Sequence, residues 1–63
     1  MALLDIVQLY PATEAVFRAR DKQAGVCLLC QALFETVADV AERYGLDLES
    51  LMKDLEQAIL HQG

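Results

Sequence analysis

The chain has 63 residues and a formal net charge of −5, from ten acidic and five basic side chains. The acidic balance excludes charge-driven binding to nucleic acid or to an anionic membrane surface, because both need clusters of Lys and Arg. The hydrophobic fraction of 56% exceeds the roughly 45–50% that is usual for soluble domains. We therefore predict a single domain over residues 1–63, with neither nucleic acid nor a membrane as its partner.

The small size and the apolar surplus together favour association with another protein. Below about 70–80 residues a single core rarely supplies more than ~3–5 kcal/mol, and much apolar surface stays uncovered. We therefore expect a homodimer or a protein partner. No segment reaches the ~18 apolar residues of a membrane span, and the N-terminus lacks the basic start and cleavage site of a signal peptide. The expected location is a reducing cytoplasm, where a cysteine pair more often serves catalysis or metal binding than a structural bridge.

Two short helices are predicted in the first third of the chain. Apolar side chains recur at helical spacing at the start, at Leu3, Leu4, Ile6 and Val7. This pattern predicts a helix over about residues 3–9. Pro11 ends it, because the residue before a proline is pushed out of the α region, and the same proline suits the first position of a second helix over about 11–20. Residues 21–25 are polar and contain a glycine, which predicts a loop that leads to the cysteines.

Two further helices are predicted in the second half. The third covers about residues 28–44, and Gly45 stands where a C-terminal glycine cap belongs. Its apolar face is formed by Leu33, Phe34, Val37, Val40, Ala41 and Tyr44. The fourth covers about 48–61, with Asp47 as its N-cap, while Leu60 points away from its apolar face. The fold class is therefore all-α, with four short helices in an orthogonal array or a bundle.

Cys27 and Cys30 are spaced as C-x-x-C, and their place on the third helix is the central question. If that helix extends back through both cysteines, Leu28 projects onto the polar face. Either the helix begins at the C-x-x-C, which we favour, or another subunit buries Leu28. A cysteine in the first turn of a helix has its thiolate stabilised by unpaired N–H groups, and such a pair can cycle between dithiol and disulfide. We predict a redox pair in which Cys27 faces solvent as the attacking thiolate and Cys30 faces the core as the resolving thiol.

Two other interpretations of the cysteines remain open. Both can be small hydrophobic residues of the core, which would make the chain a non-enzymatic interaction or dimerisation module with Leu28 and Leu60 at its interface. Alternatively, Cys27 and Cys30 of two chains can together hold zinc or an iron–sulfur cluster. One chain alone offers only His61 as a further ligand, and zinc takes four. We interpret His61 as a helix-end residue favoured by the helix dipole. No cofactor is predicted, and the sequence leaves open whether the protein is an enzyme.

The succession of motifs along the chain resembles a known family. It runs through Tyr10-Pro11, Gly25, Cys27-x-x-Cys30, Phe34-Glu35-Thr36 and Gly45-Leu46-Asp47. It is similar to a family of short bacterial and archaeal domains of unknown function, described as the hybrid-cluster-protein-associated redox disulfide domain. The resemblance covers almost the whole chain. It implies an all-α fold and a suspected dithiol role near iron–sulfur proteins, with Cys27 and Cys30 as the functional residues.

Overall fold

The structure, a computed structural model, describes residues 1–61, most of which are helical. In that part of the chain there are five helices and no strand: α1 Leu3–Leu9, α2 Thr13–Ala24, α3 Leu28–Gln31, α4 Val37–Tyr44 and α5 Leu48–Leu60. The prediction of an all-α fold is confirmed. The domain expected over 1–63 includes two residues, 62 and 63, that lie outside the described part. None of the helices between residues 1 and 61 is both long enough and apolar enough to cross a bilayer.

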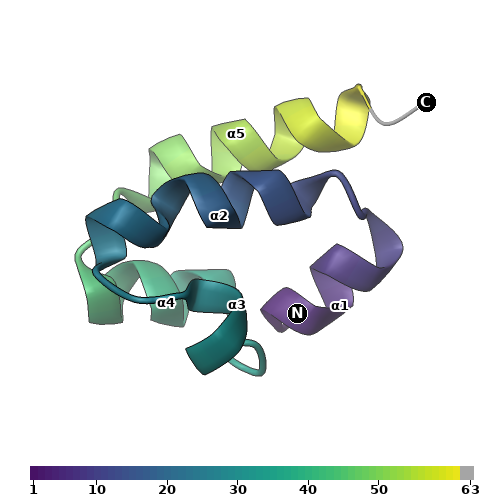
Figure 1. The fold of residues 1–63 in the computed structure, drawn as a ribbon. Helices are drawn as coiled ribbons and strands as arrows, with labels where there is room; N and C mark the ends of the chain where they lie inside the picture. The colour runs from purple at the N-terminus through teal and green to yellow at the C-terminus, as the bar shows by residue number, and fades with distance from the viewer. Residues whose placement is uncertain (62–63) are drawn as a thin grey trace.

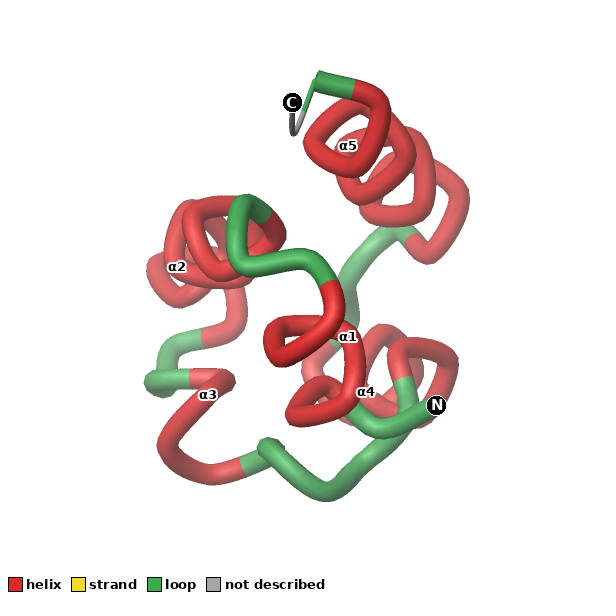
Figure 2. Tube along the Cα trace, turned by 90° about the vertical axis from the view of Figure 1, so that its right-hand side faces the viewer, coloured by secondary structure: helices red, strands yellow, loops and turns green. Residues whose placement is uncertain are grey.

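The two longest helices, α2 and α5, lie antiparallel along one side of the molecule (Figure 1). The shorter helices α1, α3 and α4 lie across the opposite side, as the end-on view in Figure 2 shows. The core is formed between these two groups. Its buried side chains are Leu3, Phe17, Leu28, Ala32, Val37, Val40, Ala41, Leu46, Leu51 and Leu55. Every helix therefore contributes at least one side chain to a single core.

The first helix has the predicted bounds, but the second begins two residues later than predicted. Pro11 lies in a turn rather than at the first helical position. Thr13 closes this turn, because its backbone N–H and its fully buried hydroxyl both donate to the carbonyl of Tyr10, at 2.9 and 2.7 Å. The helix then continues past the predicted end at residue 20, as far as Ala24. Gly25 ends it in the left-handed conformation, with φ of 77°, so residues 21–24 are helix and not loop.

The prediction of one helix over residues 28–44 is wrong. This stretch forms two helices, α3 and α4, with a connection of residues 32–36 between them. Thr36 is the N-cap of α4, and its side-chain oxygen accepts a hydrogen bond from the Asp39 N–H at 3.2 Å. This bond satisfies one of the N–H groups that a helix start leaves unpaired. One consequence is that Phe34, expected on an apolar helix face, is 80% exposed.

The connection between α3 and α4 is held by the first residues of α1. The Leu3 N–H donates to the carbonyl of Glu35 at 3.0 Å, and the Leu4 N–H donates to the carbonyl of Leu33 at 2.9 Å. These N–H groups have no acceptor within their own helix, because they lie in its first turn. The start of α1 and the connection therefore complete each other's hydrogen bonding.

The C-terminal half follows the sequence more closely. Gly45 ends α4 in the left-handed conformation, with φ of 68°. Asp47 is the N-cap of α5, since its carboxylate accepts from the Ser50 N–H at 3.2 Å. Arg20 then links α2 to α5, because its guanidinium pairs with the Asp54 carboxylate and donates to the Ser50 hydroxyl at 3.2 Å. Leu60 is 75% exposed, as predicted.

Replacing Leu28 by Ala tests its place in the core of this chain. Leu28 is fully buried, and truncation of a buried leucine costs about 2–5 kcal/mol. We expect a loss of this size in the free energy of unfolding, measured by urea titration of the helical circular dichroism. Leu60→Ala is the matched control and should change that free energy by less than about 0.5 kcal/mol. Equal effects of the two substitutions would contradict the burial of Leu28 within one chain.

Candidate functional site: the Cys27–Cys30 disulfide

Cys27 and Cys30 form a disulfide at the start of α3. Their Cα atoms are 5.2 Å apart, inside the usual range of about 4.4–6.8 Å. Cys27 is the N-cap of α3, and its carbonyl accepts hydrogen bonds from the N–H groups of Cys30 and Gln31, at 3.1 and 3.0 Å. The helix therefore begins at the C-x-x-C, which is the geometry that the position of Leu28 favoured.

The exposure of the two cysteines is the reverse of the prediction. Cys30 is exposed and Cys27 is half-buried, and neither belongs to the core or to the partly buried residues packed on it. The physical reason is the burial of Leu28, because successive residues of a helix turn by about 100°. Cys30 follows Leu28 by two residues and so points away from the core. The interpretation of both cysteines as core residues is wrong, and so is the placing of Leu28 at an interface.

Asp21 positions this helix start from the last part of α2. Its carboxylate oxygen Oδ1 accepts a hydrogen bond from the Leu28 N–H at 3.0 Å. Its backbone carbonyl accepts from the Gly25 N–H at 2.8 Å. Asp21 thus accepts the hydrogen bond of the residue that caps α2 and supplies an acceptor to the beginning of α3, seven residues later. The sequence interpretation missed Asp21 because it assigned residues 21–25 to a loop.

The cysteines lie in a stretch of sequence without charge. Residues 23–34 contain no Asp, Glu, Lys or Arg, although 24% of the chain is charged. The next charged residue after this stretch is Glu35, whose carboxylate accepts from the Arg43 guanidinium at 2.9 Å. This hydrogen bond, together with the charge of Glu35, raises the pKa of Arg43 above its ordinary value. Glu35 is therefore engaged with α4.

Metal binding by one chain finds no support in residues 1–61, because no three Cys, His, Asp or Glu side chains there are grouped to hold an ion. Zinc binds cysteine as the thiolate, whereas here the two sulfurs are bonded to each other. His61 lies beyond the last residue of α5, and that end of α5 is on the side of the molecule away from α3 (Figure 1). A metal shared by Cys27 and Cys30 of two chains stays a prediction.

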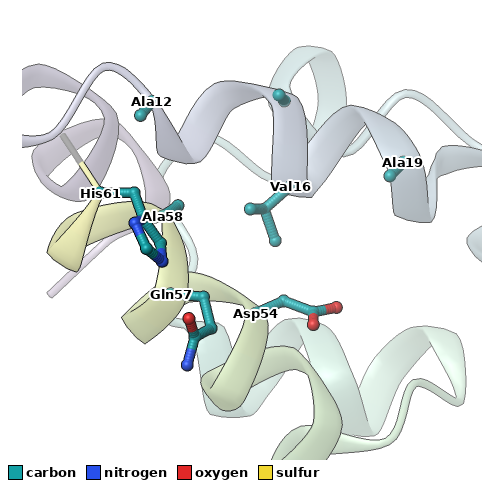
Figure 3. Close-up of a pocket in the computed structure, with 8 residues that line it drawn as sticks. Ala12, Val16, Ala19, Asp54, Gln57, Ala58 and His61 are labelled. Carbon is teal, nitrogen blue, oxygen red and sulfur yellow. The ribbon is translucent and has the colours of Figure 1, made fainter.

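The two larger of the three hollows described between residues 1 and 61 are not lined by a cysteine. One, of about 500 Å³, is a groove between α2 and α5. Figure 3 shows Ala12, Val16 and Ala19 on the α2 side of the groove, with Asp54, Gln57, Ala58 and His61 on the α5 side. The other, of about 420 Å³, lies between α1, α4 and α5, and its lining includes Met1, Ile6, Tyr10, Val37, Met52 and Ile59. Both hollows are largely apolar, so they offer packing surface and not a set of reactive groups.

No family model, curated protein or solved structure matches this chain. The resemblance to the redox disulfide domains therefore stays a prediction from the sequence. The function has to be argued from the disulfide, its unequal exposure and the residues that position it.

Replacing Asp21 by Ala tests its role at the start of α3. The substitution removes the acceptor of the Leu28 N–H, and loss of a side-chain cap costs about 0.5–2 kcal/mol. We expect that loss in the free energy of unfolding of the oxidised protein, with faster hydrogen exchange at the Leu28 amide than at amides of α5. Asp21→Asn keeps an oxygen acceptor and should restore most of the protection. Unchanged exchange at Leu28 in Asp21→Ala would show that the carboxylate does not cap α3.

Proposed function

We propose that this chain is a thiol–disulfide exchange domain that acts through Cys27 and Cys30 in a reducing cytoplasm. The observation that carries the proposal is the disulfide itself, since it joins an exposed cysteine to a half-buried one at the start of a helix. An exposed sulfur is open to attack by a thiolate of another protein, and a half-buried neighbour is suited to leave and later to return. Cys30 is therefore the residue that meets the partner, and Cys27 is the residue that resolves.

The proposed reaction transfers two electrons from a partner dithiol to the disulfide. A thiolate of the partner attacks Sγ of Cys30, the bond between Cys30 and Cys27 breaks, and Cys27 leaves as a thiolate that takes a proton from solvent. The second thiol of the partner gives its proton to solvent. The resulting thiolate attacks the partner's first sulfur, which is bonded to Cys30 in the mixed disulfide. Cys30 is then released as a thiolate, which also takes a proton from solvent. The partner ends as a disulfide and this chain as a dithiol, and the reverse sequence oxidises the pair.

The fold supports both redox states of the pair. The core cluster contains neither cysteine, so apolar burial does not depend on the bond between them. The loop that the disulfide closes spans a sequence separation of only three, and a short loop constrains the unfolded chain less than a long one. Opening the disulfide therefore leaves the packing of α2, α4 and α5 in place, as reversible exchange requires.

Single cysteine variants test the assignment of the two sulfurs. Because Cys30 is exposed and Cys27 is half-buried, the thiol of Cys27→Ser should react faster with an aromatic disulfide reagent than the thiol of Cys30→Ser. We expect a difference of roughly tenfold in the second-order rate constant, since access limits thiol reactivity. The rates after denaturation in urea serve as the control and should be equal. Faster reaction of Cys27 in the native state would reverse the assignment.

The exchange function itself is tested on the wild-type pair. Equilibration in mixtures of reduced and oxidised glutathione should give a reversible two-electron titration, followed by mass spectrometry after alkylation. The helical circular dichroism should stay the same from one end of the titration to the other. Native thiols that fail to react, or a reduced protein that unfolds, would overturn the proposal.

A second candidate function, self-association, is favoured by the hollow between α1, α4 and α5. Met52 and Met1, which line it, are 42% and 65% exposed. We propose that two copies of the chain pack these faces together, each inserting apolar side chains into the hollow of the other. A two-fold arrangement of this kind uses one self-complementary patch, which is the commonest form of homodimer.

Light scattering with Met52→Lys tests this interface. The wild-type chain should have twice its monomer mass of 7.0 kDa, and Met52→Lys should have the monomer mass, because burying an unpaired ammonium is unfavourable. Lys53→Ala changes the neighbouring exposed residue and should remain dimeric. A wild-type chain that is monomeric at its highest soluble concentration would exclude the dimer.

A further inference from the structure

Phe34 is the most exposed large hydrophobic side chain in the described part of the chain. It is 80% exposed, compared with 75% for Leu60 and 65% for Met1. Leu60 and Met1 lie at or near chain ends, whereas Phe34 lies in the internal connection between α3 and α4. A phenyl ring held in solvent inside a folded segment is typical of a contact surface, because aromatic rings supply much of the binding energy at protein interfaces.

The backbone on both sides of Phe34 is fixed by hydrogen bonds. The carbonyl of Leu33 accepts from the Leu4 N–H at 2.9 Å, and the carbonyl of Glu35 accepts from the Leu3 N–H at 3.0 Å. The Glu35 N–H donates in turn to the carbonyl of Ala32 at 3.0 Å. These three bonds anchor the chain before and after the ring, so its outward position is built into the fold. A backbone that is already fixed loses little further entropy when a partner covers the ring.

Phe34 also lies within reach of a molecule that reacts at Cys30. The two residues are four positions apart, so their Cα atoms are separated by at most about 14 Å. Leu29, just before Cys30, and Leu33, just before Phe34, are half-buried, and Gln31 is exposed and neutral. Figure 2 shows α3 and the connection to α4 along the outer edge of the molecule. The residues that neighbour the exposed Cys30 in sequence, from 23 to 34, are thus uncharged.

We propose that Leu29, Leu33 and Phe34 form a docking surface that selects protein partners whose cysteine lies in an apolar segment. Aromatic or aliphatic side chains beside the partner's cysteine pack on Phe34 while its sulfur meets Sγ of Cys30. Small charged thiols and disulfides such as glutathione reach the same equilibrium but react more slowly, because they bring no apolar surface and carry negative charge towards a chain of net charge −5. The proposal rests on the exchange function of Cys30 argued above, and it adds the class of substrate.

The test uses the Cys27→Ser protein, in which Cys30 is the single thiol, with three disulfide probes. Two are homodimeric disulfides of blocked peptides, one with Phe and Leu beside the cysteine and one with two Ser residues there, and the third is glutathione disulfide. Attack by the Cys30 thiolate gives a mixed disulfide and releases one thiol, which is measured. Each rate is divided by the rate of the same probe with free N-acetylcysteine. We expect the apolar peptide to react about tenfold faster than the serine peptide, and glutathione disulfide to be slowest.

Phe34→Ala in the Cys27→Ser background should remove the preference for the apolar peptide over the serine peptide. Leu60→Ala is the control and should keep this preference, because Leu60 is 75% exposed but lies at the end of α5. Phe34→Leu keeps an apolar side chain and should retain part of it. Equal corrected rates for the three probes would overturn the docking surface while leaving the exchange function intact. A preference that survives in Phe34→Ala would overturn it too. A Cys30 thiol that reacts with none of the probes would overturn the exchange function, and the substrate class with it.

Discussion

The pair of hydrogen bonds from the start of α1 to the connection between α3 and α4 decides much of this structure. The N–H groups of Leu3 and Leu4 need acceptors outside their own helix, and the carbonyls of Leu33 and Glu35 supply them. In a continuous helix from α3 to α4 these carbonyls would instead accept from the N–H groups four residues later, those of Val37 and Asp39. The bonds therefore keep α3 to a single turn, leave Phe34 between two anchored carbonyls, and bring fully buried Leu3 into the core.

The sequence predicted the parts of the fold that depend on neighbouring residues. The bounds of α1, the glycine cap at Gly45 and the N-cap at Asp47 are local signals, and the structure confirms each of them. The break before α4 could not be predicted from periodicity, because the apolar positions around it fit an unbroken helix and the bonds that stop it come from residues about thirty positions earlier. One local signal was present, since Thr36 stands three residues before Asp39, but the continuing apolar pattern concealed it.

The candidate site was predicted in position but not in orientation. A helix extended back through both cysteines would place Leu28 on its polar face, and this indicated correctly that α3 starts at the C-x-x-C. The exposure of each sulfur depends on how deeply that turn packs against α2, and no spacing within the turn reports such packing. The role of Asp21 could not be predicted from local patterns either. Its hydrogen bond to the Leu28 N–H spans seven residues and requires α2 to extend to Ala24. Local patterns located the disulfide, and tertiary packing determined which sulfur meets solvent.

The unequal exposure of the cysteines follows from two apolar residues rather than from the cysteines themselves. Leu28 and Ala32 are four positions apart and are 0% and 1% exposed, so together they define the inward side of α3 and its end. Cys30 lies midway between them in sequence and must point outward, because two residues of a helix turn by about 200°. Cys27 precedes Leu28 by one residue and remains at the side of the turn. Leu28, the first residue between the two cysteines, anchors the start of the helix in the core, so the C-x-x-C presents its second cysteine to solvent. Any partner that exchanges disulfides with this chain would meet Cys30 first.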